Sequence, residues 1–284
     1  IEAGWLLALL VVPLFFNVHS SRVFEPDKLS ILCSIALAMV AAWLIKVIDG
    51  SAWGVFSDTR STDSQMDVQR PSVWARLSGI PLVLPTLLLV GAYILSTVLS
   101  VAPRMSLWGS YMRLQGTYTT LSYIVIFFLM LGTMRRRRQV DRMCSVIIVT
   151  SLPISLYGIL QHYRLDSLPW SGDVTMRVAG NTGNAIFVAA YLIMAIPITL
   201  ARLVESFSAV LKESEGTISD ALLAGCYTFV LSVQLICTFF TQSRGPWLGL
   251  LGGLYVFVLV ALISLRHSIS DQSRINAQDA LRAL

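Results

Sequence analysis

Charged residues are scarce in this chain of 284 residues: they make up only 13% of it, whereas 55% of the residues are hydrophobic. Soluble domains average about 25% charged residues. The mean hydropathy of +0.71 is correspondingly high. This composition excludes an ordinary soluble enzyme and indicates an integral membrane protein. The net charge of +5 fits the basic loops that membrane proteins carry, so it gives no reason to expect a nucleic-acid partner.

Motifs of several common chemistries are missing as well. The sequence has no HExxH, GxSxG or P-loop motif and no GxGxxG motif in the context of a strand. His19 and His162 have no partner at metal-ligand spacing, so neither a metal nor another cofactor is expected. The four cysteines all lie within apolar segments without CxxC spacing and are interpreted as small hydrophobic residues; they are Cys33, Cys144, Cys226 and Cys237.

Long apolar runs dominate what is present. Eight segments approach the ~20 residues that a transmembrane helix needs, and they lack the two-residue alternation of transmembrane strands. The sequence therefore predicts an all-α, polytopic transmembrane bundle over residues 1–265, followed by a cytoplasmic tail, 266–284, that is expected to continue in a longer protein. The predicted spans are roughly 4–18, 29–48, 80–99, 117–134, 143–163, 185–203, 221–240 and 247–265.

The orientation follows from the basic residues. The run Arg135–Arg138, with Arg142, comes directly after the fourth span, and the positive-inside rule places it in the cytoplasm. Alternation then puts fourteen Lys and Arg residues in cytoplasmic segments and seven in external ones, which predicts that the N-terminus and the C-terminus are both cytoplasmic. The run is interpreted as a topology anchor, with a lipid-binding or nucleic-acid-binding patch as the alternative. The polar stretch 49–79 is expected to be a cytoplasmic linker.

The predicted external loops repeatedly place arginine near glycine. Arg104 and Arg113 share the loop 100–116, and Arg177 precedes the glycines of the loop 164–184. Arg244 lies in a predicted tight turn, Ser243-Arg244-Gly245-Pro246. Glycine permits close approach of the backbone, and arginine matches a phosphate group with two parallel hydrogen bonds. These loops therefore predict an anion site.

Two predicted helix starts strengthen this interpretation. Asn184 immediately precedes the sixth span, and Pro246 is expected to open the eighth. Helix N-termini attract anions through their unsatisfied N–H groups, so a diphosphate or another polyanionic headgroup fits. The alternative is that Arg104 and Arg113 are interfacial residues beside an aromatic belt of Trp108 and Tyr111, and that the remaining arginines are merely solvated.

Three elements together resemble one family. Residues 241–249, TQSRGPWLG, resemble the Ser-Arg-Gly element of the O-antigen ligase and polymerase superfamily. Arg177, with Gly180, Gly183, Asn184 and the following apolar helix that contains Pro197, resembles a second element of that family. The stretch 106–116, SLWGSYMRLQG, is similar to a third element, found in large members from filamentous and photosynthetic bacteria.

The resemblance implies a glycosyltransferase of the bacterial inner membrane that needs no metal. It would move a glycan from a polyprenyl-diphosphate donor to an acceptor hydroxyl on the external, periplasmic face. Arg177 and Arg244 would be the catalytic arginines that hold the diphosphate. Arg104, Arg113, Asn184, Ser243 and Gly245 are the candidate substrate-binding residues.

The resemblance also implies features that this sequence does not contain. Members of the family usually have about twelve spans, and a histidine on a later external loop acts on the acceptor. Neither is found within these 284 residues. The expected partners are the lipid-linked glycan, the bilayer and further membrane subunits.

Two other functions remain open. An anion or inorganic-carbon transporter would also use external arginines, although no span carries a carboxylate in its middle, where ion transporters usually have one. A non-catalytic subunit of a larger membrane complex agrees with the missing histidine.

Overall fold

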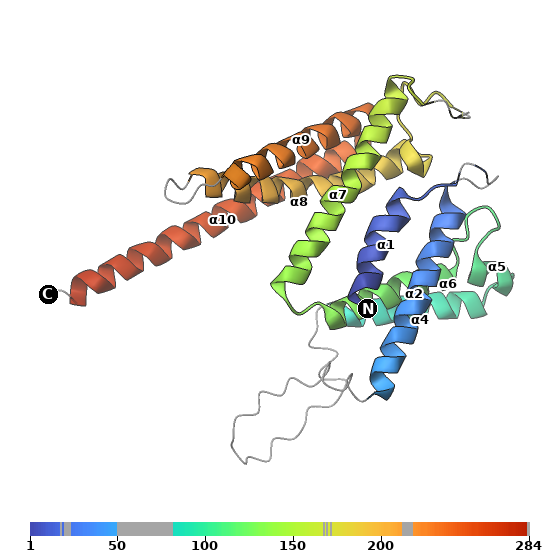
Figure 1. Ribbon diagram of the computed structural model, residues 1–284. Coiled ribbons are helices and arrows are strands. Elements are labelled where there is room, and N and C mark those ends of the chain that lie inside the picture. The colour runs from blue at the N-terminus through green and yellow to red at the C-terminus, as the bar shows by residue number, and fades with distance from the viewer. Residues whose placement is uncertain are drawn as a thin grey trace, which may run out of the picture. The chain divides into compact units, whose positions relative to one another are not determined.

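The chain is all-α in a computed structural model (Figure 1). The structure describes residues 1–17, 19, 24–49, 82–166, 168, 170, 172–211 and 218–282, with side chains up to residue 263 except at 209 and 211. Within these ranges there are nine α-helices and one short 3-10 turn, η2 (Gly180–Thr182). Almost all of the linker predicted at 49–79 lies outside the described residues.

Each of the eight predicted apolar segments corresponds to a helix. Five helices are long and apolar enough to cross a membrane, so a multi-pass membrane protein is plausible. The other three are shorter; α1, for example, has 13 residues, or roughly 20 Å at 1.5 Å per residue. The long helices are α2 (Glu25–Ile48), α7 (Arg137–His162), α8 (Ala185–Leu211), α9 (Ile218–Phe240) and α10 (Arg244–Arg282), and the short ones are α1 (Glu2–Leu14), α4 (Val83–Val98) and α6 (Thr117–Thr133).

One helix was not anticipated. The loop predicted at 100–116 contains α5 (Pro103–Trp108). Pro103 occupies its first turn, where the missing N–H of proline is harmless. Gly109 ends it with a φ of 82°, which only glycine adopts readily.

The start of α7 also differs from the prediction. This helix begins at Arg137, inside the arginine run, rather than near residue 143. The reason is a capping side chain, because Gln139 Oε1 accepts hydrogen bonds from the backbone N–H groups of Arg135 and Arg136 (2.8 and 2.9 Å). Unsatisfied N–H groups at a helix start are stabilised in this way.

The predicted turn before α10 is wrong in its position. Helix α10 begins at Arg244 rather than at Pro246, so the stretch 243–246 is not a turn. The chain reverses earlier, at Thr241 and Gln242, where Gln242 has a φ of 47°. The helix also continues to Arg282 instead of ending near residue 265.

The described chain forms two compact units that divide within α7. In unit 1, Ile1–Ile147, a small core of Ala8, Leu29 and Leu32 joins α1 to α2, and Ile126 of α6 packs against it. Helix α1 is tied down at both ends: Glu2 forms an ion pair with Arg142, and Lys28 donates to the carbonyl oxygen of Pro13 (3.2 Å).

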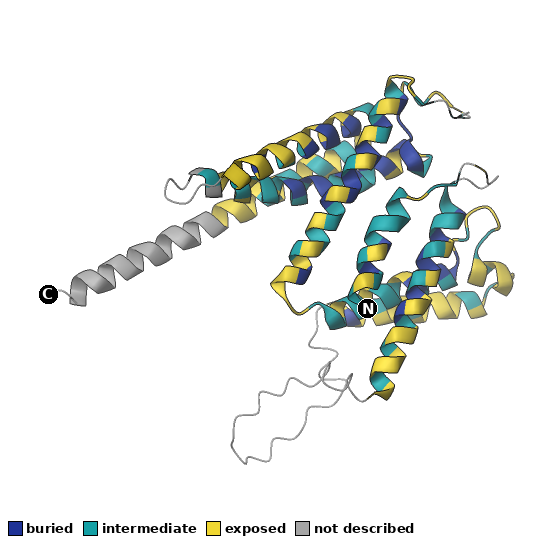
Figure 2. Ribbon diagram, viewed as in Figure 1, coloured by how far each residue is buried: buried dark blue, intermediate teal, exposed yellow. Residues whose placement is uncertain are grey.

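In unit 2, Ile148–Leu284, α8 packs against both α9 and α10. The buried residues of this unit lie on α7, α8 and α9, whereas the described side chains of α10, up to residue 263, are mostly exposed (Figure 2). Gln234 of α9 is fully buried and donates to Ser151 of α7 (2.6 Å) and Thr199 of α8 (3.0 Å). Such hydrogen bonds between side chains link helices within a membrane. These hydrogen bonds join α7, α8 and α9, and α10 packs against α8.

Candidate functional site

The loop that carries Arg177 is bonded to the end of α9. The backbone N–H of Val178 donates to the carbonyl oxygen of Phe240 (3.2 Å). Arg177 Nε donates to the carbonyl oxygen of Thr241 (3.3 Å), and its Nη2 donates to Ser243 Oγ (3.4 Å). These contacts join residues that are more than 60 positions apart in the chain. Arg177 is thus held next to the residue that precedes Arg244.

Ser243 and Arg244 form the start of α10. Ser243 is 2% exposed, and its hydroxyl donates to the carbonyl oxygen of Thr241 (3.2 Å) while accepting from Arg177. Arg244, the first residue of the helix, is exposed. A side chain added at Gly245 would meet no atom within 4 Å. The first turn of α10 therefore offers Arg244, the N–H groups of a helix start and open space at Gly245, with Arg177 bonded to the preceding Ser243, and this arrangement suits an anion.

The last turn of α7 supports the Arg177 loop through a hydrogen-bond network. Asp166 accepts hydrogen bonds from the Tyr157 hydroxyl (2.8 Å), the Trp170 indole (2.8 Å) and the Leu168 backbone (3.0 Å). Gln161, which is 1% exposed, donates to Asp166 (3.4 Å). Its Oε1 accepts from the N–H of Gly180 (2.7 Å). Gln161 thus connects Asp166 and Gly180, which lie near the two ends of the loop 164–184.

His162 belongs to the same support. Its Nδ1 lies 2.6 Å from the carbonyl oxygen of Thr175, and because a carbonyl can only accept, Nδ1 carries the proton. The imidazole also stacks on Phe240 with ring centroids 3.7 Å apart. Sequence reasoning assigned no role to Gln161, His162 or Asp166. The one available signal was the position of polar residues at the end of an otherwise apolar segment.

The turn into α8 depends on two glycines and on Asn184. Gly180 and Gly183 have φ values of 57° and 71°, and a Cβ at Gly180 would lie 2.6 Å from a methyl group of Val188. Asn184 Oδ1 accepts from the N–H of Ile186 (3.0 Å), as expected of a helix-capping residue. The predicted helix start is confirmed, whereas contact between Asn184 and a substrate stays a prediction.

A polar cavity lies in unit 1, beside Arg113. Its volume is about 400 Å³, and its wall includes the backbone around Gly109 and Gly116. A Cβ at Gly116 would lie 2.3 Å from the carbonyl oxygen of Leu107. The backbone at Gly116 can therefore approach the end of α5 only because this residue is glycine. Arg104, on α5, is exposed and is not among the lining residues. The cavity is lined by Tyr93, Ser96, Met105, Ser106, Gly109, Ser110, Arg113, Gln115, Gly116 and Thr117.

The predicted site residues therefore form two groups. Arg177, Ser243, Arg244 and Gly245 come together in unit 2, whereas the cavity beside Arg113 belongs to unit 1. Within the described ranges, no group of three or more His, Cys, Asp or Glu residues is placed to hold a metal ion. The chemistry available in unit 2 is the binding of an anion by arginines, hydroxyl groups and backbone N–H groups.

Comparisons of this chain with protein-family models, with curated proteins and with solved structures find no match.

The Asp166 network gives a prediction about pH. Burial raises the pKa of this carboxyl, but the four hydrogen bonds that it accepts outweigh burial, so its pKa lies below the ordinary value of 3.8. A lowered pKa stabilises the fold above the unfolded-state value, and this stabilisation is lost as the pH falls through the folded-state value. Asp166→Asn should lower the thermal unfolding temperature at pH 7 by a few degrees, for about 1 kcal/mol of lost hydrogen bonding.

Thermal unfolding of the solubilised protein tests this expectation at pH 7 and again well below pH 3.8, where the difference between wild type and variant should disappear. Asp49→Asn is the control, because it changes an exposed carboxylate at the end of α2 and should leave the unfolding temperature unchanged. An unfolding temperature for Asp166→Asn equal to that of wild type at pH 7 would contradict the proposed support.

Proposed function

We propose that this chain belongs to a membrane glycosyltransferase of the O-antigen ligase type. It transfers a glycan from a polyprenyl-diphosphate donor to an acceptor hydroxyl on the external face of the bacterial inner membrane. The observation that carries the proposal is the convergence of Arg177, Ser243 and Arg244 at the start of α10. Permanent positive charge beside a helix N-terminus is the environment that a diphosphate requires.

The proposed reaction is an inverting displacement. The acceptor oxygen forms a bond to the anomeric carbon, and the bond between that carbon and the diphosphate oxygen breaks. The bonding electron pair leaves with the diphosphate, so negative charge grows there in the transition state. Arg177 and Arg244 stabilise this charge, which is the electrostatic form of catalysis. The acceptor proton leaves to a base that lies outside the residues assigned in this chain.

The proposed topology has eight spans with both termini in the cytoplasm. Contacts within unit 1 support it, because Glu2 at the start of α1 bonds to Gln139 just beyond the end of α6 (2.9 Å). At the opposite ends, Gln115 before α6 bonds to Glu25 at the start of α2 (3.2 Å). These contacts place the start of α1 beside the end of α6 and the start of α2 beside the start of α6, as expected if consecutive spans run in opposite directions. Arg177 and Arg244 are then external.

A non-catalytic membrane subunit is the second candidate. The exposure of α10 favours it, since none of the membrane-length window Arg244–Ile263 is buried. A large apolar face of this kind is available to lipid or to helices of another subunit.

The decisive experiment is a transfer assay with the purified protein in proteoliposomes. A polyprenyl-diphosphate-linked oligosaccharide is supplied with an acceptor glycolipid, and mass spectrometry follows both the product and the released polyprenyl diphosphate. The proposal expects both to appear together without added metal. Donor binding without transfer would favour the non-catalytic subunit, and neither binding nor transfer would overturn the proposed donor class.

A further inference from the structure

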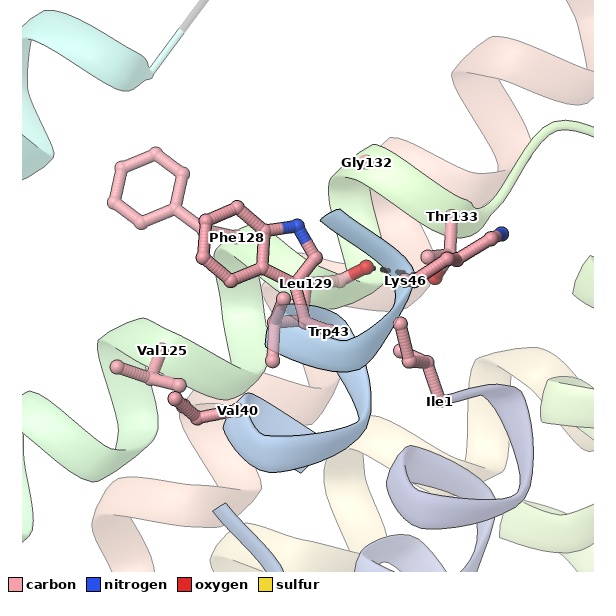
Figure 3. Close-up of a pocket in the computed structure, with 9 residues that line it drawn as sticks. All are labelled: Ile1, Val40, Trp43, Lys46, Val125, Phe128, Leu129, Gly132 and Thr133. Atoms are coloured by element: carbon pink, nitrogen blue, oxygen red, sulfur yellow. Dashed lines mark hydrogen bonds between the residues drawn. The ribbon is translucent and has the colours of Figure 1, made fainter. Parts of the chain in front are cut away.

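Unit 1 contains an apolar cavity that the proposed reaction does not use. It has a volume of about 370 Å³, within the range of roughly 300–1,000 Å³ that is usual for ligand sites. Figure 3 draws the side chains that surround it, which come from α2, from α6 and from the residue before α1. They are Ile1, Val40, Trp43, Lys46, Val125, Phe128, Leu129, Gly132 and Thr133.

The cavity has an apolar body and one polar end. Val40 of α2 and Val125 of α6 lie about two helical turns before the ends of their helices, in the apolar part. Lys46 and Thr133 lie in the last turns of the same two helices. The hydroxyl of Thr133 donates to the carbonyl oxygen of Leu129 (2.6 Å). Lys46 has the one charged side chain among the nine residues that line the cavity, so it supplies the positive charge at this end.

More positive charge follows α6 immediately. The four arginines of Arg135–Arg138 begin two residues after Thr133, and all four are exposed. Their backbone position is set by Gln139, which bonds to the N–H groups of Arg135 and Arg136 and to Glu2. The run is therefore fixed against the end of α6 that forms the cavity.

We propose that this cavity binds an anionic phospholipid. One acyl chain occupies the space between Val40, Val125 and Leu129, and the phosphodiester lies beside Lys46 and the arginine run. Apolar surface between membrane helices that ends in clustered basic residues is the arrangement that recognises acidic lipid headgroups. A zwitterionic lipid offers the same acyl chain without net negative charge. The proposal concerns the end of unit 1 opposite the Arg113 cavity and does not depend on the transfer reaction.

The fluorescence of Trp43 reports occupancy directly. The intact protein is reconstituted in phosphatidylcholine vesicles that contain increasing fractions of phosphatidylglycerol, with bromine on the acyl chains of one lipid at a time. Bromine quenches only nearby indoles, and a parallel series with Trp43→Phe isolates the contribution of Trp43 from the other six tryptophans. We expect brominated phosphatidylglycerol to quench this contribution at a fraction about tenfold lower than brominated phosphatidylcholine does.

Two changes should remove this preference. Raising the salt concentration screens the headgroup contact in the wild-type protein, and Lys46→Gln combined with Arg135→Gln and Arg136→Gln removes the charge. Arg202→Gln, which removes a basic residue of unit 2, should leave the preference unchanged. Equal quenching of the wild-type protein by the two lipids would overturn the proposal, as would a preference that survives high salt. The salt measurement decides the question if the triple variant does not fold.

Discussion

Replacing Arg244 with alanine is expected to lower glycan transfer by about 10²–10³-fold, the loss seen when one group that stabilises transition-state charge is removed. Arg244 is the exposed first residue of α10, and its neighbour Gly245 leaves open space beside it. The substitution removes no hydrogen bond that supports the fold in the described part of unit 2. Membrane insertion and thermal unfolding should therefore remain as in the wild type.

Two further variants separate the role of Arg244 from a general effect of charge. Arg244→Lys keeps the positive charge but loses the paired donors of the guanidinium group, so its activity should fall between those of wild type and alanine. Arg202→Ala removes an arginine that pairs with Glu205 on α8 and should leave transfer unchanged. Transfer by Arg244→Ala at the wild-type rate would show that Arg244 does not act on the leaving group.

The kinetic pattern identifies the step that Arg244 serves. A loss in kcat with little change in KM means that the arginine acts mainly on the charge developing in the transition state. A rise in KM alone means that it binds the diphosphate equally well before and during the reaction. We expect the first pattern, because negative charge grows on the diphosphate as the bond to the sugar breaks.

The helices were largely predictable, and their ends were not. A continuous apolar run of about 20 residues has few alternatives to a helix in a membrane, so all eight predicted segments were found as helices. Helix α5 has only six residues and shows no periodicity that a sequence could display. The start of α7 depends on Gln139, which caps the nearby N–H groups of Arg135 and Arg136 and also donates to Glu2, 137 residues away. Only the capping contacts are local in the sequence.

The candidate site shows the same division between features that the sequence predicts and contacts that it does not. The Arg-Gly loops predicted an anion site, which stays a prediction, and the structure shows that Arg177 bonds to Thr241 and Ser243, just before Arg244. The supporting residues were missed because their partners are distant in the chain or depend on loop geometry. Gln161 reaches Gly180, 19 residues away, and His162 stacks on Phe240. A glutamine and a histidine in an apolar segment indicate only that some polar partner exists.

Arg177→Ala is expected to reduce transfer at least as strongly as Arg244→Ala. Its guanidinium donates to Thr241 and to Ser243, so the substitution removes both a charge and the attachment of the loop to the start of α10. Each hydrogen bond contributes about 0.5–1.5 kcal/mol, and we expect a measurable fall in the thermal unfolding temperature that Arg244→Ala does not cause. Wild-type activity in Arg177→Ala would contradict its assignment.

Ser243→Ala separates the two roles of Arg177. It removes the contact with Nη2 but keeps the arginine and its bond to Thr241, so it should cause only a small part of the loss if Arg177 acts mainly on the substrate. The double variant of Arg177 and Arg244 provides the sharper test. Two arginines that hold one diphosphate act as a unit, so their effects should be far from additive: the double variant should be little worse than either single one. Fully multiplicative losses would mean that the two arginines stabilise the reaction at separate places.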